Sequence, residues 1–328
     1  MQKSLYKIYY HSYKNIVIKI LYFLQLVKKT DIVSLIFNTV RERCKTRSDI
    51  MKHSKGIFYV LMAAVLFSIG GLCIKLIPWS PLSINGARNF ISVIIMGAYL
   101  KATHHKIVIN PAVIFGAVCL MGTTTLYCIA NKLTTAANTI VLQFTAPIFV
   151  IFFMWLFFKE KPKKVDIMAS AVVFVGIICF FIDGLSTGNM LGNGLAVLSG
   201  VTYAGVFMMN SFKKSDSLSS IFLGQALSAV TCIWFLLGET DFGAKAIGGI
   251  VILGVFQLAL AYIFMSKGLD EVPAVTASLT TAIEPILNPV LVAIFYHEMI
   301  TPLSMVGAVI VIGAVVGYNV YKAVKVLA

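Results

Sequence analysis

Charged residues are scarce in this chain of 328 residues, where they make up 12% of the composition and acidic residues occupy only 13 positions. Soluble domains carry about 25% charged and about 45 to 50% apolar residues. Here 59% of the residues are hydrophobic, which is more apolar surface than a soluble core of this size could bury. The composition therefore excludes a soluble globular protein and predicts an all-α integral membrane protein.

The sequence also lacks the spacings that carry metal-binding and catalytic chemistry. Its six cysteines include no CxxC pair, so we interpret them as small packing residues and expect neither a metal site nor a disulfide framework. The GxxxxGK[ST] phosphate loop, the HExxH zinc pair and the GxSxG elbow are all missing. We therefore expect a protein that is not an enzyme and that has no resident cofactor.

Ten apolar runs, each about 18 to 23 residues long, follow one another after residue 56, and each is long enough to cross a hydrocarbon core of about 30 Å. They cover residues 57–77, 81–100, 111–130, 136–158, 165–182, 191–209, 218–237, 246–265, 273–295 and 303–321. Because unpaired backbone groups are costly in lipid, we expect ten transmembrane helices. The short connections place neighbouring helices antiparallel.

Lysines distinguish the two ends of these helices. Thirteen lie at one end, against Lys132 and Lys245 at the other. The thirteen are Lys52, Lys55, Lys101, Lys106, Lys159, Lys161, Lys163, Lys164, Lys213, Lys214, Lys267, Lys322 and Lys325. Since Lys and Arg collect on the cytoplasmic side, both termini are predicted to be cytoplasmic in a multi-pass protein of the cell membrane. The positive charge thus reflects orientation next to the lipid bilayer, and we expect no nucleic-acid partner.

The first fifty residues differ from the rest. They are basic, and their best apolar run, 16–27, is too short to span a bilayer. Met51 leads directly into the first strong helix and resembles a natural start. We expect 1–50 to be an N-terminal extension that is either absent from the native protein or lies on the membrane surface. The remaining chain divides into one five-helix repeat at 51–185 and a second at 186–328.

The two halves match when they are aligned. At a shift of 138 residues, Pro147 falls on Pro285, Phe157 on Phe295 and Glu160 on Glu298. At a shift of 136 residues, the aromatic Phe67 falls on the aromatic Tyr203. A unit of five crossings is odd, so the second copy must enter the membrane from the opposite face. Inverted repeats that meet around a site at the bilayer midplane are typical of transporters, because the two halves can exchange roles.

The sequence resembles the EamA-type family of the drug/metabolite transporter superfamily. The resemblance runs from about Met51 to the C-terminus. It is carried by residues 66–71, Arg88, Pro147, residues 157–160, Glu284, Pro285, residues 295–298, Gly307 and Gly313. It implies ten helices in two inverted five-helix repeats around a central cavity. Export of the solute is expected from this family analogy alone.

Arg88 and Glu284 are the sharpest candidates for a binding site, since both lie deep within apolar runs. An unpaired charge at membrane depth costs several kcal/mol, so each should face the interior of the helix bundle. Arg88 either attracts an anionic group of the solute or pairs with Glu284 or helix-end carbonyls. Glu284 either exchanges a proton during transport or forms that same pair with Arg88. Lys75, near the end of the first run, is interpreted mainly as a snorkelling residue.

Other polar residues at membrane depth could line the same cavity or form hydrogen bonds between helices. They are Tyr127, Gln143, Tyr203, Gln257, Tyr262 and Asn288. Pro147, Pro285 and Pro289 lie inside apolar runs, where each removes a backbone donor and predicts a bend. Gly307, Gly313 and Gly317 predict close helix packing, either within the chain or in a homodimer.

Taken together, these patterns predict a secondary transporter that moves a small organic metabolite, such as an amino acid or related carboxylate, by alternating access. Its partners would be the small-molecule solute and the bilayer. The alternative from another class is a membrane sensor or structural membrane protein that supports no net flux.

Overall fold

The computed structural model describes residues 47–70, 73–74, 77–182, 185, 189–287 and 301–327. The chain divides into two units, one of which is Met51–Tyr321 and the other Met1–Ile50 with Lys322–Ala328. The side-chain contacts that form the candidate site lie within the larger unit, Met51–Tyr321. Lys75, Asn288, Pro289 and Glu298, which the sequence singled out, lie outside the described residues.

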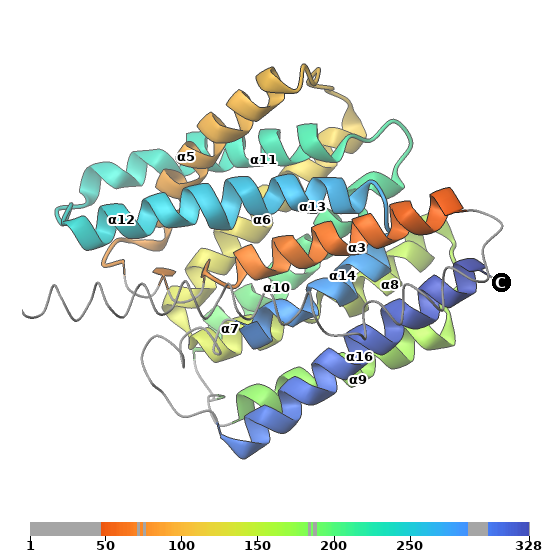
Figure 1. Cartoon of the computed structure of the whole chain (residues 1–328). Coiled ribbons are helices and arrows are strands. Elements are labelled where there is room, and N and C mark those ends of the chain that lie inside the picture. The colour runs from red at the N-terminus through yellow and green to blue at the C-terminus, as the bar shows by residue number, and fades with distance from the viewer. Residues whose placement is uncertain are drawn as a thin grey trace, which may run out of the picture. The chain divides into compact units, whose positions relative to one another are not determined.

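All described elements are helical (Figure 1). The first half contains α3 (Arg47–Phe67), α5 (Pro81–Ala102), α6 (Pro111–Leu133), α7 (Ala136–Gln143), α8 (Ala146–Phe158) and α9 (Lys164–Phe181). The second half contains α10 (Met190–Met208), α11 (Ser217–Cys232), α12 (Ala244–Ile252), α13 (Ala261–Leu269), α14 (Ala274–Thr280) and α16 (Pro302–Leu327). A π-helical segment, Leu253–Leu260, joins α12 to α13, and short 3-10 turns cover Met209–Ser211, Ile233–Gly238 and Thr281–Ile283.

Seven described helices are long and apolar enough to cross a membrane. They are Pro111–Leu133, Ala136–Phe158, Lys164–Phe181, Met190–Ser211, Ser217–Gly238, Ala244–Leu269 and Pro302–Val324. The prediction of an all-helical membrane protein is thus confirmed, whereas the count of ten spanning helices stays a prediction. Of the three other runs, 273–295 is described only as the shorter apolar helix Ala274–Leu287.

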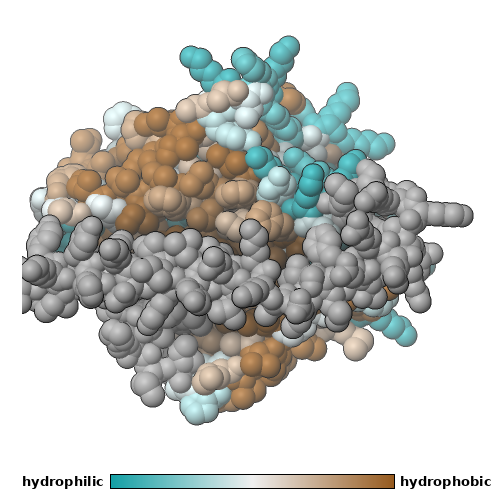
Figure 2. Space-filling view, viewed as in Figure 1, coloured by the Kyte–Doolittle hydropathy of each residue, from teal (hydrophilic) through white to brown (hydrophobic). Residues whose placement is uncertain are grey.

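The spanning helices expose apolar side chains on their outer faces, as contact with lipid requires. Ile94, Val230 and Val309 are 58%, 65% and 71% exposed. The space-filling view shows hydrophobic surface over much of the visible face, with hydrophilic side chains gathered toward its right end (Figure 2). A soluble protein would bury such residues, so this surface fits the hydrocarbon core of a bilayer.

Helix α5 turns its polar residues inward. Asn85, Arg88, Asn89 and Ser92 are at most 1% exposed, while Phe90 on the opposite face is 51% exposed. The helix begins at Pro81, behind a Ser80 side chain that accepts a hydrogen bond from the Ser83 amide. This buried polar face explains why the mean hydropathy of α5 is lower than that of the seven apolar helices.

Two helices are broken where proline predicts it. Pro147 cannot donate to the Gln143 carbonyl, and α7 ends at Gln143 while α8 begins at Ala146. Ahead of Pro285, α14 gives way to the 3-10 turn Thr281–Ile283. The helix around Pro147 and the helix around Pro285 are therefore both interrupted just before the proline, so that both interruptions can line a common site.

The glycines of α16 behave differently from one another. A Cβ on Gly307 would lie 2.4 Å from the Phe180 amide nitrogen and 2.7 Å from the Gly176 carbonyl oxygen, so Gly307 permits close packing of α16 on α9. Gly313 and Gly317 have no described neighbour within 4 Å of such a Cβ. The expectation of close packing within the chain is therefore confirmed at Gly307, whereas at Gly313 and Gly317 close packing within the chain or in a homodimer stays a prediction.

Candidate functional site

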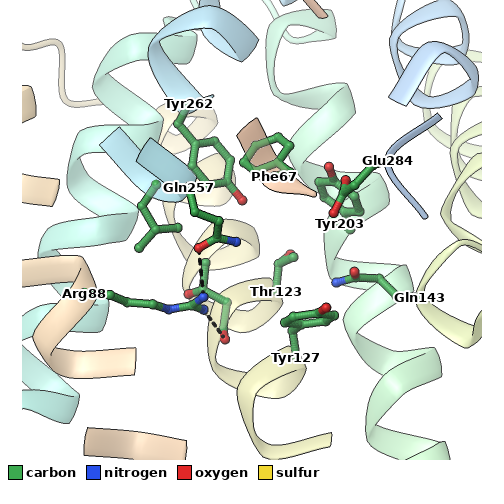
Figure 3. Close-up of a pocket in the computed structure, with 11 residues that line it drawn as sticks. Phe67, Arg88, Thr123, Tyr127, Gln143, Tyr203, Gln257, Tyr262 and Glu284 are labelled. Atoms are coloured by element: carbon green, nitrogen blue, oxygen red, sulfur yellow. Dashed lines mark hydrogen bonds between the residues drawn. The ribbon is translucent and has the colours of Figure 1, made fainter. Parts of the chain in front are cut away.

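One pocket in the described helices gathers side chains from both halves of the chain (Figure 3). The space between them that no protein atom fills is about 370 Å³, including its open mouth. Helices α3, α5, α6 and α7 contribute from the first half, and α10, the π segment, α13 and the stretch after α14 from the second. The lining residues are Phe67, Arg88, Thr123, Thr124, Tyr127, Gln143, Tyr203, Gln257, Leu258, Tyr262 and Glu284.

Seven of the eight residues predicted from the sequence line this pocket. The eighth, Asn288, lies outside the described residues. Sequence reasoning missed four lining residues. Thr123 and Thr124 could have been found, because they precede Tyr127 by about one helical turn, and Phe67 could have been found because it aligns with Tyr203. Leu258 carries no polar signal.

Arg88 is buried at 1% exposure and bonded only to neutral groups. Its Nη1 donates to Gln257 Oε1 at 3.1 Å, and its Nη2 donates to Asn85 Oδ1 and to the Thr124 carbonyl oxygen, each at 3.2 Å. Its Nε has no hydrogen-bond partner in the described structure. The guanidinium is therefore a buried positive charge with no carboxylate beside it, an arrangement that costs several kcal/mol unless a ligand supplies the anion.

Glu284 supplies the carboxyl group of the pocket. It directly follows the 3-10 turn that interrupts its helix, and its Oε2 is buried without a hydrogen-bond partner among the described residues. Glu284 and Arg88 form no ion pair, so the alternative in which these two residues pair with each other is wrong. A guanidinium and a carboxyl group thus face one pocket without a bond between them.

Aromatic and amide groups surround these two charges. The rings of Phe67 and Tyr262 meet edge to face with their centroids 4.8 Å apart. Gln143 projects from the end of α7, and a Cβ added to Gly200 of α10 would lie 2.8 Å from the Gln143 carbonyl oxygen. Tyr127 and Tyr203 complete the wall in Figure 3. Hydroxyl and amide groups can adapt their hydrogen bonds to a polar solute, while the rings exclude water.

The pocket contains no constellation for binding a metal. Across the described residues, no group of three or more His, Cys, Asp or Glu side chains could hold a metal ion. What the pocket offers chemically is a guanidinium and a separate carboxyl group, together with neutral hydrogen-bonding side chains.

Comparison with known proteins identifies a family whose model matches this chain. Residues 54–182 and residues 190–320 each match the model of the EamA-like transporter family. The family pattern therefore occurs twice, once in each half of the chain.

Curated relatives agree with this match. The "Uncharacterized transporter YwfM" of Bacillus subtilis (strain 168) is 26% identical over 279 residues, which cover 81% of this chain and 94% of that protein. Solute carrier family 35 member G1 of Homo sapiens is 23% identical over 294 residues, covering 81% of this chain and 79% of that protein. A solved crystal structure superposes with a TM-score of 0.70 at 16% identity, covering 83% of this chain and 99% of the other. This last likeness shows the fold alone.

Proposed function

The chain belongs to the EamA-like transporter family, and from this premise we propose that it moves a small organic solute bearing a carboxylate, such as an amino acid, across the membrane by alternating access. Similar proteins are named as transporters, and the apolar helices make this a multi-pass membrane protein. The single observation that carries the substrate class is the buried guanidinium of Arg88, which is bonded to no carboxylate among the described residues.

The architecture we propose is ten transmembrane helices in two inverted five-helix repeats, with both termini in the cytoplasm. Reciprocal contacts support it. After α5, His105 lies 2.9 Å from Asp216 at the start of α11, and after α11, Glu239 accepts a hydrogen bond of 2.8 Å from the Ser80 amide at the start of α5. Such an exchange of partners at opposite ends is expected of two units related by inversion.

Glu284 is the group that we propose couples transport to protons. A carboxylate buried without a hydrogen-bond partner can take up and release a proton as the pocket changes sides. Its place in the same pocket as Arg88 would allow proton and solute to influence each other. Export across the cell membrane is proposed by family analogy alone.

Reconstituted vesicles test the proposal directly. Purified protein in liposomes should give saturable uptake of at least one radiolabelled carboxylate from a panel of amino acids, 2-oxo acids and dicarboxylates. Arg88→Lys keeps the charge but removes the planar fork, so half-saturation should rise about tenfold or more, since a charge-assisted hydrogen bond contributes about 1.5 to 3 kcal/mol. Uptake is measured at several solute concentrations.

Lys245→Ala is the matched control, because it removes an exposed cation that does not line the pocket. Its half-saturation should equal that of the unmodified chain. Binding of a carboxylate without any flux would support a membrane sensor instead. Equal kinetics for Arg88→Lys and the unmodified chain would remove Arg88 from the solute site.

A further inference from the structure

Gln257 lines the pocket beside Arg88 and accepts a hydrogen bond from its guanidinium. Of the three groups that accept hydrogen bonds from the guanidinium, Asn85 is not part of the pocket lining, and the Thr124 acceptor is a main-chain carbonyl held in α6. Gln257 alone both lines the pocket and contributes a side-chain oxygen that can swing away. Figure 3 shows its amide next to the Arg88 guanidinium, with a dashed line marking the hydrogen bond between them.

The local backbone holds Gln257 in this place. It lies within the π segment Leu253–Leu260, and π-helical turns are rare and frequent at functional sites. The segment packs tightly on α5, because a Cβ on Gly254 would lie 3.0 Å from the Arg88 carbonyl oxygen. From the other side, a Cβ on Gly70 would lie 2.7 Å from Gln257 Nε2. The absence of a side chain at Gly70 thus leaves room for the amide.

We propose that Gln257 determines specificity as a stand-in for the solute: its side-chain oxygen occupies the position on Arg88 that an anionic group of the solute takes when it binds. A neutral amide oxygen satisfies the guanidinium without cancelling its charge, so an entering carboxylate displaces it with a stronger, charge-assisted bond. The displaced bond joins α5 of the first repeat to the π segment of the second. Solute binding therefore releases a link between the two repeats.

This inference rests on the proposed role of Arg88 as the anion-binding group, and acetate serves as the minimal probe. The melting temperature of the purified full chain is measured against sodium acetate, with sodium chloride at equal ionic strength as the salt reference. Gln257→Ala removes the competitor, so acetate should bind about tenfold more tightly than to the unmodified chain, the value of one hydrogen bond to a charged group. Gln257→Glu places a carboxylate beside Arg88 and should abolish the acetate response.

Gly70→Ala separates competition from mere extra space, since it displaces the amide without shortening Gln257. It should tighten acetate binding in the same direction as Gln257→Ala. Phe256→Ala, an exposed neighbour on the same π segment, and Gly194→Ala, where an added Cβ meets nothing within 4 Å, are the matched controls and should match the unmodified chain.

The outcomes distinguish this inference from the proposed function. If acetate stabilises the unmodified chain through Arg88, as shown by loss of the effect in Arg88→Lys, but Gln257→Ala binds it equally or more weakly, then Gln257 merely holds Arg88 and the inference is overturned alone. If acetate stabilises no variant, the anion site and the inference both fail. Tighter binding by Gln257→Ala and Gly70→Ala supports the inference even where no flux is measured.

Discussion

Glu284 is the residue whose replacement separates coupled from uncoupled transport. Glu284→Gln keeps the size of the side chain but cannot exchange a proton. A pH gradient of one unit can drive about tenfold accumulation for each proton carried. The unmodified chain in liposomes should reach accumulation of this order with a gradient, and Glu284→Gln should show none, while both carry solute down its own gradient. Radiolabelled uptake with and without the gradient measures the difference.

Glu160→Gln is the control for this experiment. Glu160 is an exposed carboxylate just after α8 and occupies the position that the repeat alignment pairs with Glu298. Its replacement should leave the response to the gradient unchanged. A Glu284→Gln variant that still concentrates solute in response to pH would contradict proton coupling through this residue.

Residue types at membrane depth could be read from the sequence, but their partners could not. Arg88 and Glu284 were both expected to face the interior because isolated charges are costly in lipid, and both line the pocket. The bond from Arg88 to Asn85 spans less than one helical turn, so spacing could have suggested it. The bond to Gln257 joins positions 169 residues apart and depends on how two helices pack, which periodicity does not encode.

At the scale of the element, the start of α11 depends on a charged cap. Asp216 accepts a hydrogen bond from the Ser219 amide at 2.9 Å, and its other neighbour, His105, lies at 2.9 Å. Burial raises the pKa of the Asp216 carboxyl, but the hydrogen bonds with Ser219 and His105 outweigh burial and hold this pKa below its ordinary value. The folded state therefore favours the ionised cap.

This shift predicts how stability depends on pH. A lowered pKa in the folded state gives stability that is present above the unfolded pKa and is lost as the pH falls through the folded pKa. Asp216→Asn keeps a good capping residue but loses the charge, so its melting temperature should lie a few degrees below that of the unmodified chain at neutral pH. The difference should shrink as the pH falls below the ordinary aspartate pKa of about 3.9 and disappear once the pH is below the lowered pKa of the folded state.

Thermal unfolding of the purified proteins across this pH range provides the measurement. His105→Gln, which removes the partner and leaves the cap, should reproduce part of the loss at neutral pH. A gap between Asp216→Asn and the unmodified chain that is the same at every pH would show that the charge of the cap contributes nothing.

The two helix breaks could be predicted from the sequence, whereas the π segment could not. The breaks at Gln143–Ala146 and at Thr281–Ile283 follow from Pro147 and Pro285, because proline removes a donor wherever it lies. The π segment Leu253–Leu260 has no comparable signature. Its residues form an ordinary apolar run, in which Gly254 packs closely against α5.

At the scale of the whole molecule, the hydropathy of the sequence established a membrane protein but did not fix every span. The helix α5 illustrates why: its buried face of Asn85, Arg88 and Asn89 lowers its mean hydropathy, although it is 22 residues long. Polar groups at a solute site lower the mean hydropathy of the helix that carries them. Such a helix is therefore harder to recognise as a membrane span from its sequence.

The final prediction follows from the proposed orientation of the protein in the membrane. Lys161, between α8 and α9, and Lys245, in the first turn of α12, are both exposed, and the lysine distribution assigns them to opposite sides of the membrane. In intact cells, Lys245→Cys should react with a membrane-impermeant maleimide, whereas Lys161→Cys should react only after the cells are permeabilised. The unmodified chain, with its native cysteines, supplies the background. Equal labelling of both positions in intact cells, or the reverse pattern, would contradict cytoplasmic termini, because an even number of crossings fixes both ends on the side of Lys161.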